Sequence, residues 1–237
     1  MDFSTGNEPR REPDPGNSSG EMGDPGSEMS GGSGNGDFDL GDPVQSFVRT
    51  VQGVLLNPVG FFRELPRQGG FVPPLVFALI CSVIAGVLAG IVNALVGLTF
   101  SNQGIGTVLG ALVLTIILTP IFTVIGLFVG AAIFHLLVFL LVKPSNAGFE
   151  ATFRVGAYIS ATQLFSWLSG VPILGILISL AVGVYSIVLA VLGIREMHST
   201  TTGRAVAVVL IPVVVAGIIG LLIAVVIGIL IAAAFSQ

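Results

Sequence analysis

The sequence predicts an all-α polytopic membrane protein with five transmembrane helices, a disordered acidic N-terminal tail and one or two juxtamembrane amphipathic helices. Apolar residues make up 53% of the 237 positions and charged residues only 9%, against about 25% charged in ordinary soluble domains. The apolar runs are continuous over about 20 residues or more, as membrane-spanning helices require, whereas a β-barrel needs alternating segments of about ten residues. The composition therefore excludes a water-soluble fold, and the lipid bilayer is the first expected partner.

The basic residues define the predicted topology, because all nine can be placed on one side of the membrane by a single threading of the chain. Lys and Arg accumulate in cytoplasmic loops close to the ends of spans. Residues 1–41 carry nine acids and two Arg, whereas residues 42–237 carry four acids and seven bases. The acidic tail and the basic membrane body are therefore separate modules, and the tail could fold back onto the body.

Residues 1–41 are rich in Gly, Ser, Pro, Asp and Glu and contain little to bury, so we expect a disordered tail. Residues 42–70 follow as a juxtamembrane segment, and residues 71–237 form the membrane domain. Asp42-Pro43 and Asn57-Pro58 each pair a helix-capping side chain with a proline at the first helical position. They predict two short amphipathic helices, which lie either on the inner membrane surface or against the protein's own cytoplasmic loops.

Five spans are expected from the apolar runs, at about 74–98, 108–142, 149–168, 171–194 and 205–234. The second run is long enough for two crossings, but two would move Lys143, Arg154, Arg195 and Arg204 to the outer side. We therefore expect one long helix that is kinked or broken near Pro120. Five crossings of the cell membrane place the N-terminus in the cytoplasm and the C-terminus outside.

The third span is the least hydrophobic, and we expect its neighbours to shield it from lipid. Arg154 lies near its start, where the side chain can snorkel to the inner interface, and Trp167 falls at the outer boundary.

The spans contain few polar groups, and three are candidates for an intramembrane site: Asn93, His135 and Gln163. His135 is either a proton-responsive or ligand-binding residue or a neutral ring that bonds a neighbouring helix. Asn93 and Gln163 are expected to hydrogen-bond across helices. Small residues recur at four-residue spacing, for example Gly86 and Gly90, and either pack the monomer or form a homo-oligomer interface.

No nucleophile, metal-ligand pair or phosphate-binding loop accompanies these spans, so we expect neither an enzyme nor a bound cofactor or metal. No nucleic-acid partner is expected. The remaining candidate site is the inner face, whose residues could bind anionic lipid head groups or an acidic partner, or could serve only to orient the protein. These residues are Arg49, Arg63, Arg67, Lys143, Arg154, Tyr158, Arg195, His198 and Arg204.

Three segments at this inner face resemble the Yip family of five-span membrane proteins, which are named for interaction with Ypt/Rab GTPases. The segments are Asn57-Pro58 with Phe61-Phe62, the run from Ala151 to Tyr158, and the run from Gly193 to His198 leading to Gly203-Arg204-Ala205. The likeness covers about residues 43–233. The family's Asp-Leu-aromatic-Gly-Pro signature is replaced here by Asp39-Leu40-Gly41-Asp42-Pro43, so the chain is more similar to the prokaryotic branch.

The resemblance implies a five-span fold and, as in eukaryotic members, a role beside partner membrane proteins in trafficking. We therefore expect a non-enzymatic scaffold or adaptor that binds membrane proteins or lipids through its cytoplasmic face and contributes to membrane organisation or trafficking. The alternative is a small permease or channel subunit that uses a polar site between helices.

Overall fold

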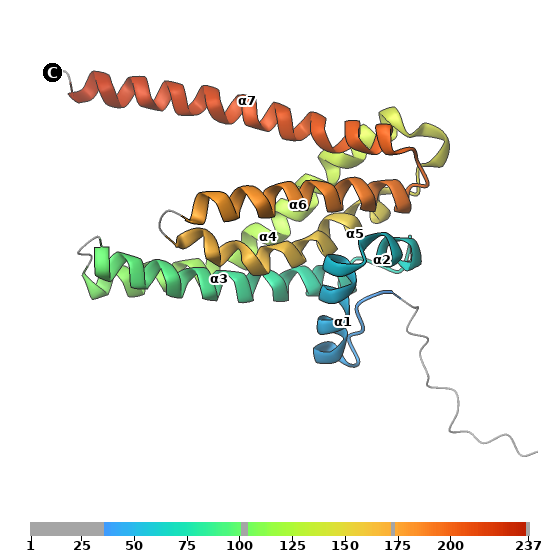
Figure 1. Ribbon diagram of the computed structural model, residues 1–237, viewed down its shortest axis with the longest axis horizontal. Coiled ribbons are helices and arrows are strands. Elements are labelled where there is room, and N and C mark those ends of the chain that lie inside the picture. Colours follow the sequence, from blue (N-terminus) through green and yellow to red (C-terminus); the bar gives the residue numbers. More distant parts are fainter. Residues whose placement is uncertain (1–35, 101–103, 172–173, 236–237) are drawn as a thin grey trace, which may run out of the picture. The chain divides into compact units, whose positions relative to one another are not determined.

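The computed structural model describes residues 36–100, 104–171 and 174–235, and within them all the regular structure is helical (Figure 1). The elements, in chain order, are α1 (Pro43–Leu56), α2 (Pro58–Glu64), α3 (Val72–Phe100), α4 (Ile105–Leu141), η1 (Lys143–Ser145), α5 (Phe149–Ile159), η2 (Ser160–Gly170), α6 (Leu174–Met197) and α7 (Thr202–Phe235). Two of these, η1 and η2, are 3₁₀-helices.

Within the described residues, four helices are long and apolar enough to cross a membrane, namely α3, α4, α6 and α7. The shortest of them, α6, has 24 residues and is about 36 Å long at 1.5 Å per residue, which exceeds a hydrocarbon core of about 30 Å. An all-helical, multi-pass membrane protein is therefore confirmed.

The third predicted span consists of two helical pieces that follow each other without a gap, α5 and η2. α5 packs against α3, α4 and α6, and η2 packs against α3 and α6. These neighbours bury most of α5 together with Ser160 and Thr162 of η2, which accounts for the polar composition of this segment. Neither piece is long enough by itself to span a bilayer.

The long second run forms a single helix, α4, which contains Pro120. Proline has no backbone N–H, so it cannot donate a hydrogen bond within the helix. On neighbouring turns, the hydroxyls of Thr115, Thr119 and Thr123 donate to carbonyls four residues earlier, at 2.8, 2.7 and 2.9 Å. These side chains bond to the backbone locally, as polar groups surrounded by hydrocarbon must.

The two short helices begin at their capping residues: the Asp42 carboxylate accepts the Gln45 amide, and the Asn57 side chain accepts the Gly60 amide. α2 packs on α6 and buries Phe61 and Phe62. The end of α1 is held by the Tyr185 hydroxyl of α6, which donates to the Leu55 carbonyl. The buried faces of both helices thus lie against the protein's own helices. α1 still exposes a separate apolar group, namely Val44, Val48 and Leu56.

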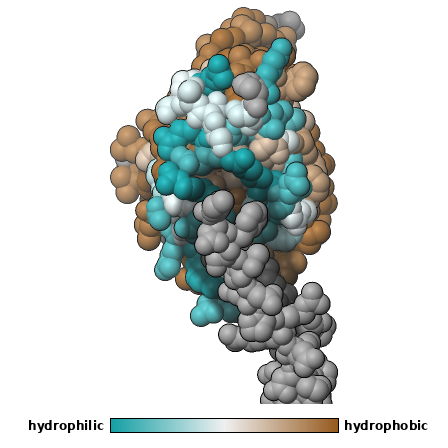
Figure 2. Space-filling model, turned by 90° about the vertical axis from the view of Figure 1, so that its right-hand side faces the viewer, coloured by the Kyte–Doolittle hydropathy of each residue, from teal (hydrophilic) through white to brown (hydrophobic). Residues whose placement is uncertain are grey.

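One end of the helices carries the polar side chains, and we call residues 36–71, 142–158 and 195–204 the polar end. Among the side-chain contacts that join its segments are three outside α5. Arg63 lies 3.3 Å from Glu196, Arg67 donates to Ser199 at 2.5 Å, and the Ala147 amide donates to His198 at 3.1 Å. Figure 2 shows hydrophilic residues gathered on this face with hydrophobic residues around it, as expected where helices leave a membrane.

Glycines allow close helix crossings at some of the predicted positions and not at others. A methyl group added at Gly90 of α3 would lie 2.5 Å from Leu112 of α4, whereas one added at Gly126 or Gly130 would meet nothing within 4 Å. Gly193 is the tightest crossing between α5 and α6, because a Cβ there would lie 2.6 Å from a Val155 methyl group. The small residues therefore pack the monomer only at some of these crossings.

Gly193→Ala should lower the melting temperature of the detergent-solubilised protein, since Val155 is β-branched and cannot turn away freely. Overpacking of this kind costs about 1–3 kcal/mol. Gly183→Ala is the matched control in the same helix, because its Cβ would enter open space, and alanine has the higher helix propensity. Equal melting temperatures for the two variants would contradict the tight crossing.

Candidate functional site at the polar end

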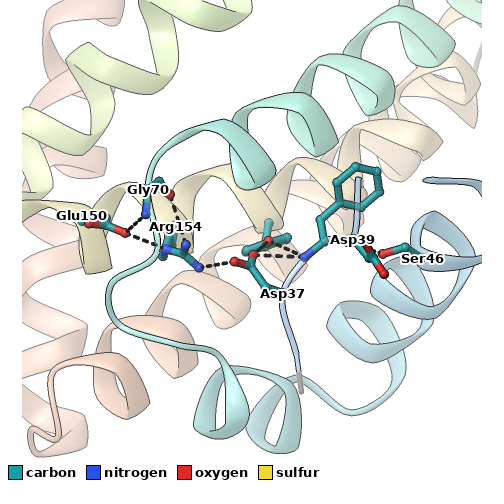
Figure 3. Close-up of polar contacts among 8 residues, drawn as sticks. Asp37, Asp39, Ser46, Gly70, Glu150 and Arg154 are labelled. Carbon is teal, nitrogen blue, oxygen red and sulfur yellow. Dashed lines mark hydrogen bonds and ion pairs between the residues drawn. The ribbon is translucent and has the colours of Figure 1, made fainter. Parts of the chain in front are cut away.

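The centre of the polar end is Arg154, which lies in the middle of α5 and whose side chain is fully buried. Its guanidinium makes three contacts (Figure 3): Nη1 lies 3.0 Å from Asp37 Oδ2, Nε lies 3.2 Å from Glu150 Oε1, and Nη2 donates to the Gly70 carbonyl at 3.1 Å. A buried cation is tolerated only when it is paired and hydrogen-bonded. The partners of Arg154 therefore lie within the protein itself.

The spacing of α5 builds this network, because Glu150, Arg154 and Tyr158 lie four residues apart and so share one helix face. Glu150 also accepts the Gly70 amide at 2.7 Å. Tyr158 is buried, and its hydroxyl donates to Asp37 Oδ1. Two oxygens of one carboxylate are thus held by two side chains of α5, one turn apart.

Asp37 and Phe38 belong to the segment before α1, and both bind the helices. The Phe38 amide donates to the Tyr158 hydroxyl at 3.0 Å, and its ring is buried 5.8 Å from that of Phe77 in α3. The Asp39 amide donates to Ser46 of α1 at 2.7 Å. The expectation of disorder up to residue 41 is therefore wrong for residues 36–41, and residues 1–35 lie outside the described residues.

Gly69 allows the chain to reach Arg154. Its φ is +152°, and a Cβ at this position would lie 2.7 Å from Arg154 Nη2. A side chain here would displace the guanidinium from the adjacent Gly70 carbonyl, so the connection from α2 to α3 needs glycine at this point.

A second polar cluster joins the two histidines of the chain through Thr152. The Ala147 amide donates to His198 Nδ1, so this nitrogen is unprotonated and the neutral ring carries its proton on Nε2. His198 Nε2 lies 3.1 Å from Thr152 Oγ1, which lies 3.1 Å from His135 Nδ1. The bonds run in one direction: His198 donates to Thr152, and Thr152 donates to His135.

His135 therefore bonds a neighbouring helix, which is one of the two alternatives expected for it. His198 is fully buried, not part of an accessible inner surface. Burial lowers the pKa of His198, and the nearby His135 and Arg67 act in the same direction, so that together they bring it from 6.5 to about 4.

The other inner-face bases divide into those that contact another side chain and those that do not. Arg63 and Arg195 both contact Glu196, at 3.3 and 2.7 Å, and Arg67 contacts Ser199. Arg49, Lys143 and Arg204 are exposed, and none of them forms an ion pair with a described residue. Among the described bases, these three have no side-chain contact that would compete with a partner.

The two remaining intramembrane candidates line two different cavities. Asn93 lines a cavity of about 360 Å³ between α3 and α4. Gln163 of η2 is exposed and lines a cavity of about 410 Å³ with Gly126 of α4 and Ser186 of α6. No third carboxylate, His or Cys completes a metal-binding group anywhere in the described ranges.

Sequence reasoning did not select Asp37, Phe38, Glu150 or Thr152 as site residues. The spacing of Glu150, Arg154 and Tyr158 is visible in the sequence and is the signal that would have identified the charged stripe on α5. Asp37 has no comparable signal, because 117 residues separate it from Arg154.

The apolar helices and the charge network at one end of them define a polytopic membrane protein. Residues 53–225 match the family model described as the Yip1 domain, and the chain belongs to this family. The family resemblance stated from the sequence is thereby confirmed. No curated protein and no solved structure matches the chain.

The stability of the protein should fall as the pH is lowered from 7 to 5. The pKa of His198 in the folded protein, about 4, lies below its ordinary value near 6.5, so the unfolded chain binds the proton more strongly in that interval. The neutral ring contributes its full stability above pH 6.5, and about 2 kcal/mol of it is lost by pH 5.

His198→Gln isolates this contribution, because a glutamine can accept the Ala147 amide and donate to Thr152 without titrating. Melting temperatures of both proteins at pH 7 and pH 5 should show a smaller decrease for the variant. The same decrease in both would mean that His198 is not responsible.

Proposed function

We propose that this protein is a non-enzymatic membrane scaffold or adaptor that binds other membrane proteins or anionic lipids through its polar end. The observation that carries the proposal is the network of Arg154, a buried cation on a helix whose carboxylate partner, Asp37, comes from a segment outside the helix bundle. The site holds an acidic segment by charge and by hydrogen bonds, which is a binding function. The exposed bases Arg49, Lys143 and Arg204 extend the same positive face.

The proposal includes a topology of five crossings, in which α5 and η2 together form the third. These 22 residues extend over about 38 Å, at 1.5 Å per α-helical and 2.0 Å per 3₁₀ residue. The polar end, which carries the Lys and Arg residues, faces the cytoplasm of the cell membrane, and the C-terminus lies outside. The replacement of the aromatic-Gly-Pro signature supports a place in the prokaryotic-type branch.

A permease or channel subunit is the second candidate, and the cavity beside Gln163 is the observation that favours it. Its neighbouring polar groups, however, already bond within the protein. The Ser186 hydroxyl contacts Thr162 at 2.9 Å, and Thr123 donates to the Thr119 carbonyl. A transport path needs groups that can exchange their partners, so this arrangement supports the scaffold better. A homo-oligomer is compatible with either function, since α7 is almost entirely exposed beyond Val209.

Thiol labelling tests the topology, starting from Cys81→Ala, which removes the only cysteine. Single cysteines replace the exposed residues Gln68 before α3, Thr107 in α4 and Thr202 at the start of α7. A membrane-impermeant reagent should reach Gln68→Cys and Thr202→Cys from one side and Thr107→Cys from the other. Labelling of Gln68→Cys and Thr202→Cys from opposite sides would show that α5 and η2 do not cross.

Photocrosslinking in native membranes tests the function. A photoreactive residue at Arg49 or Lys143 should give defined crosslinked bands with other membrane proteins or with anionic lipid. The same residue at Ile176, an exposed position near the start of α6, is the control. Solute flux in proteoliposomes that Gln163→Ala abolishes, without crosslinks specific to Arg49 or Lys143, would favour the permease.

A further inference from the structure

We propose that Arg154, Tyr158 and Phe77 form a receptor site for a peptide in which an aspartate precedes a phenylalanine, and that Asp37-Phe38 occupies this site in cis. The inference rests on the proposed scaffold function and names the chemistry of the partner that the polar end recognises. A partner protein would bring its own acidic-aromatic segment and exchange it for Asp37-Phe38.

The receptor side is complete without the segment that fills it. Arg154 and Tyr158 lie on one face of α5, and Phe77 lies on α3. The guanidinium is held from behind by Glu150 and by the Gly70 carbonyl, so Nη1 stays directed at the position of the incoming carboxylate. A site with its donors fixed on helices loses little side-chain freedom when it binds.

The ligand side consists of two consecutive residues, Asp37 and Phe38. The Asp37 carboxylate accepts a hydrogen bond from Arg154 with one oxygen, as Figure 3 shows, and one from Tyr158 with the other. The Phe38 amide bonds to the Tyr158 hydroxyl, and the Phe38 ring packs on Phe77. Any chain segment with this pair of residues offers the same carboxylate, amide and ring.

One side of the segment is open to water. A cavity of about 270 Å³ lies beside it and is lined by Gly36, Asp37, Arg49 and Glu64, among others. The Asp37 side chain retains 17% exposure, although Arg154 has none. Water therefore reaches Asp37 but not Arg154, and a competing segment would enter from that cavity.

An empty site is unfavourable, because Arg154 would keep a buried charge with one partner fewer. The short connection from Phe38 to Asp42, where α1 is capped, gives the cis segment a high effective concentration. A free peptide therefore competes poorly with it, and a partner protein succeeds by adding contacts to Arg49 and the surrounding bases. A partner must therefore bind the site more tightly than the cis segment does.

A peptide fits this site better than a lipid phosphate does. A phosphate could replace the carboxylate at Arg154, but it offers neither the amide for Tyr158 nor the ring for Phe77. The pocket is therefore suited to a carboxylate followed by an aromatic ring.

The test uses the full chain in nanodiscs of uncharged phosphatidylcholine and a vacated variant with Asp37→Asn and Phe38→Ala. The chain has one other Asp-Phe pair, Asp2-Phe3, so the variant also carries Asp2→Asn and Phe3→Ala. The probe is a fluorescent peptide with the sequence of residues 34–41, and fluorescence anisotropy reports binding. The vacated variant should bind it saturably and at least tenfold more tightly than the unmodified protein does.

Three matched changes identify the contacts. A peptide with Asn at the position of Asp37, or with Ala at that of Phe38, should bind at least tenfold more weakly. Tyr158→Phe in the vacated variant should weaken the unmodified peptide by about tenfold, since it removes a hydrogen bond to a charged group. Equal binding of all these peptides would overturn the proposal.

A second measurement needs no vacated variant. Hydrogen exchange of the Phe38 amide in the unmodified protein should accelerate when the peptide is added in large excess, and should not respond to the Asn peptide. Absence of peptide binding together with unchanged exchange would overturn the proposal. Loss of peptide binding when phosphatidylglycerol is included would also overturn it, since the site would then bind a lipid phosphate.

Partner crosslinks at Arg49 without peptide binding would leave the scaffold function standing and remove only this inference.

Discussion

The polar end depends on the burial of one positive charge, that of Arg154. An arginine cannot lose its proton in a protein, so its burial requires anions and carbonyls placed around it. The fold supplies them from three places: Glu150 from the preceding turn of α5, Gly70 from the connection before α3, and Asp37 from the segment before α1. Chain segments that are far apart in sequence meet here because each satisfies a donor of the same guanidinium.

The helices could be predicted from the sequence because the forces that form them are local. In hydrocarbon every backbone polar group must find a partner within its own segment, so a long apolar run becomes a helix even through Pro120. The same holds for the helix starts at Pro43 and Pro58, where the preceding Asp or Asn caps the first turn. The prediction of disorder failed where the average composition of a segment differs from the character of individual residues in it. The tail is polar as a whole, yet Asp37 and Phe38 near its end bind the helices.

The two histidines show which part of a site is beyond sequence reasoning. His135 was expected within a span and His198 at the inner face, so neither suggested the other. Their link is Thr152 in the first turn of α5, which starts deep enough to lie beside both. The position at which α5 begins relative to the other helices follows from how these helices pack. That packing involves contacts between residues distant in sequence. The polarity of Thr152 gave no indication of this role.

The distribution of polar groups favours recognition over transport. Within the apolar helices, the hydroxyls of Thr115, Thr119 and Thr123 are committed to their own backbone, which stabilises the helix but leaves few groups for a passing solute. At the polar end, by contrast, Arg154 binds a carboxylate from outside the bundle. Such a buried charge rejects any segment that cannot neutralise it, so it contributes more to specificity than to affinity. That is the property the proposed scaffold function requires, because a scaffold must select its partners in a membrane crowded with apolar helices.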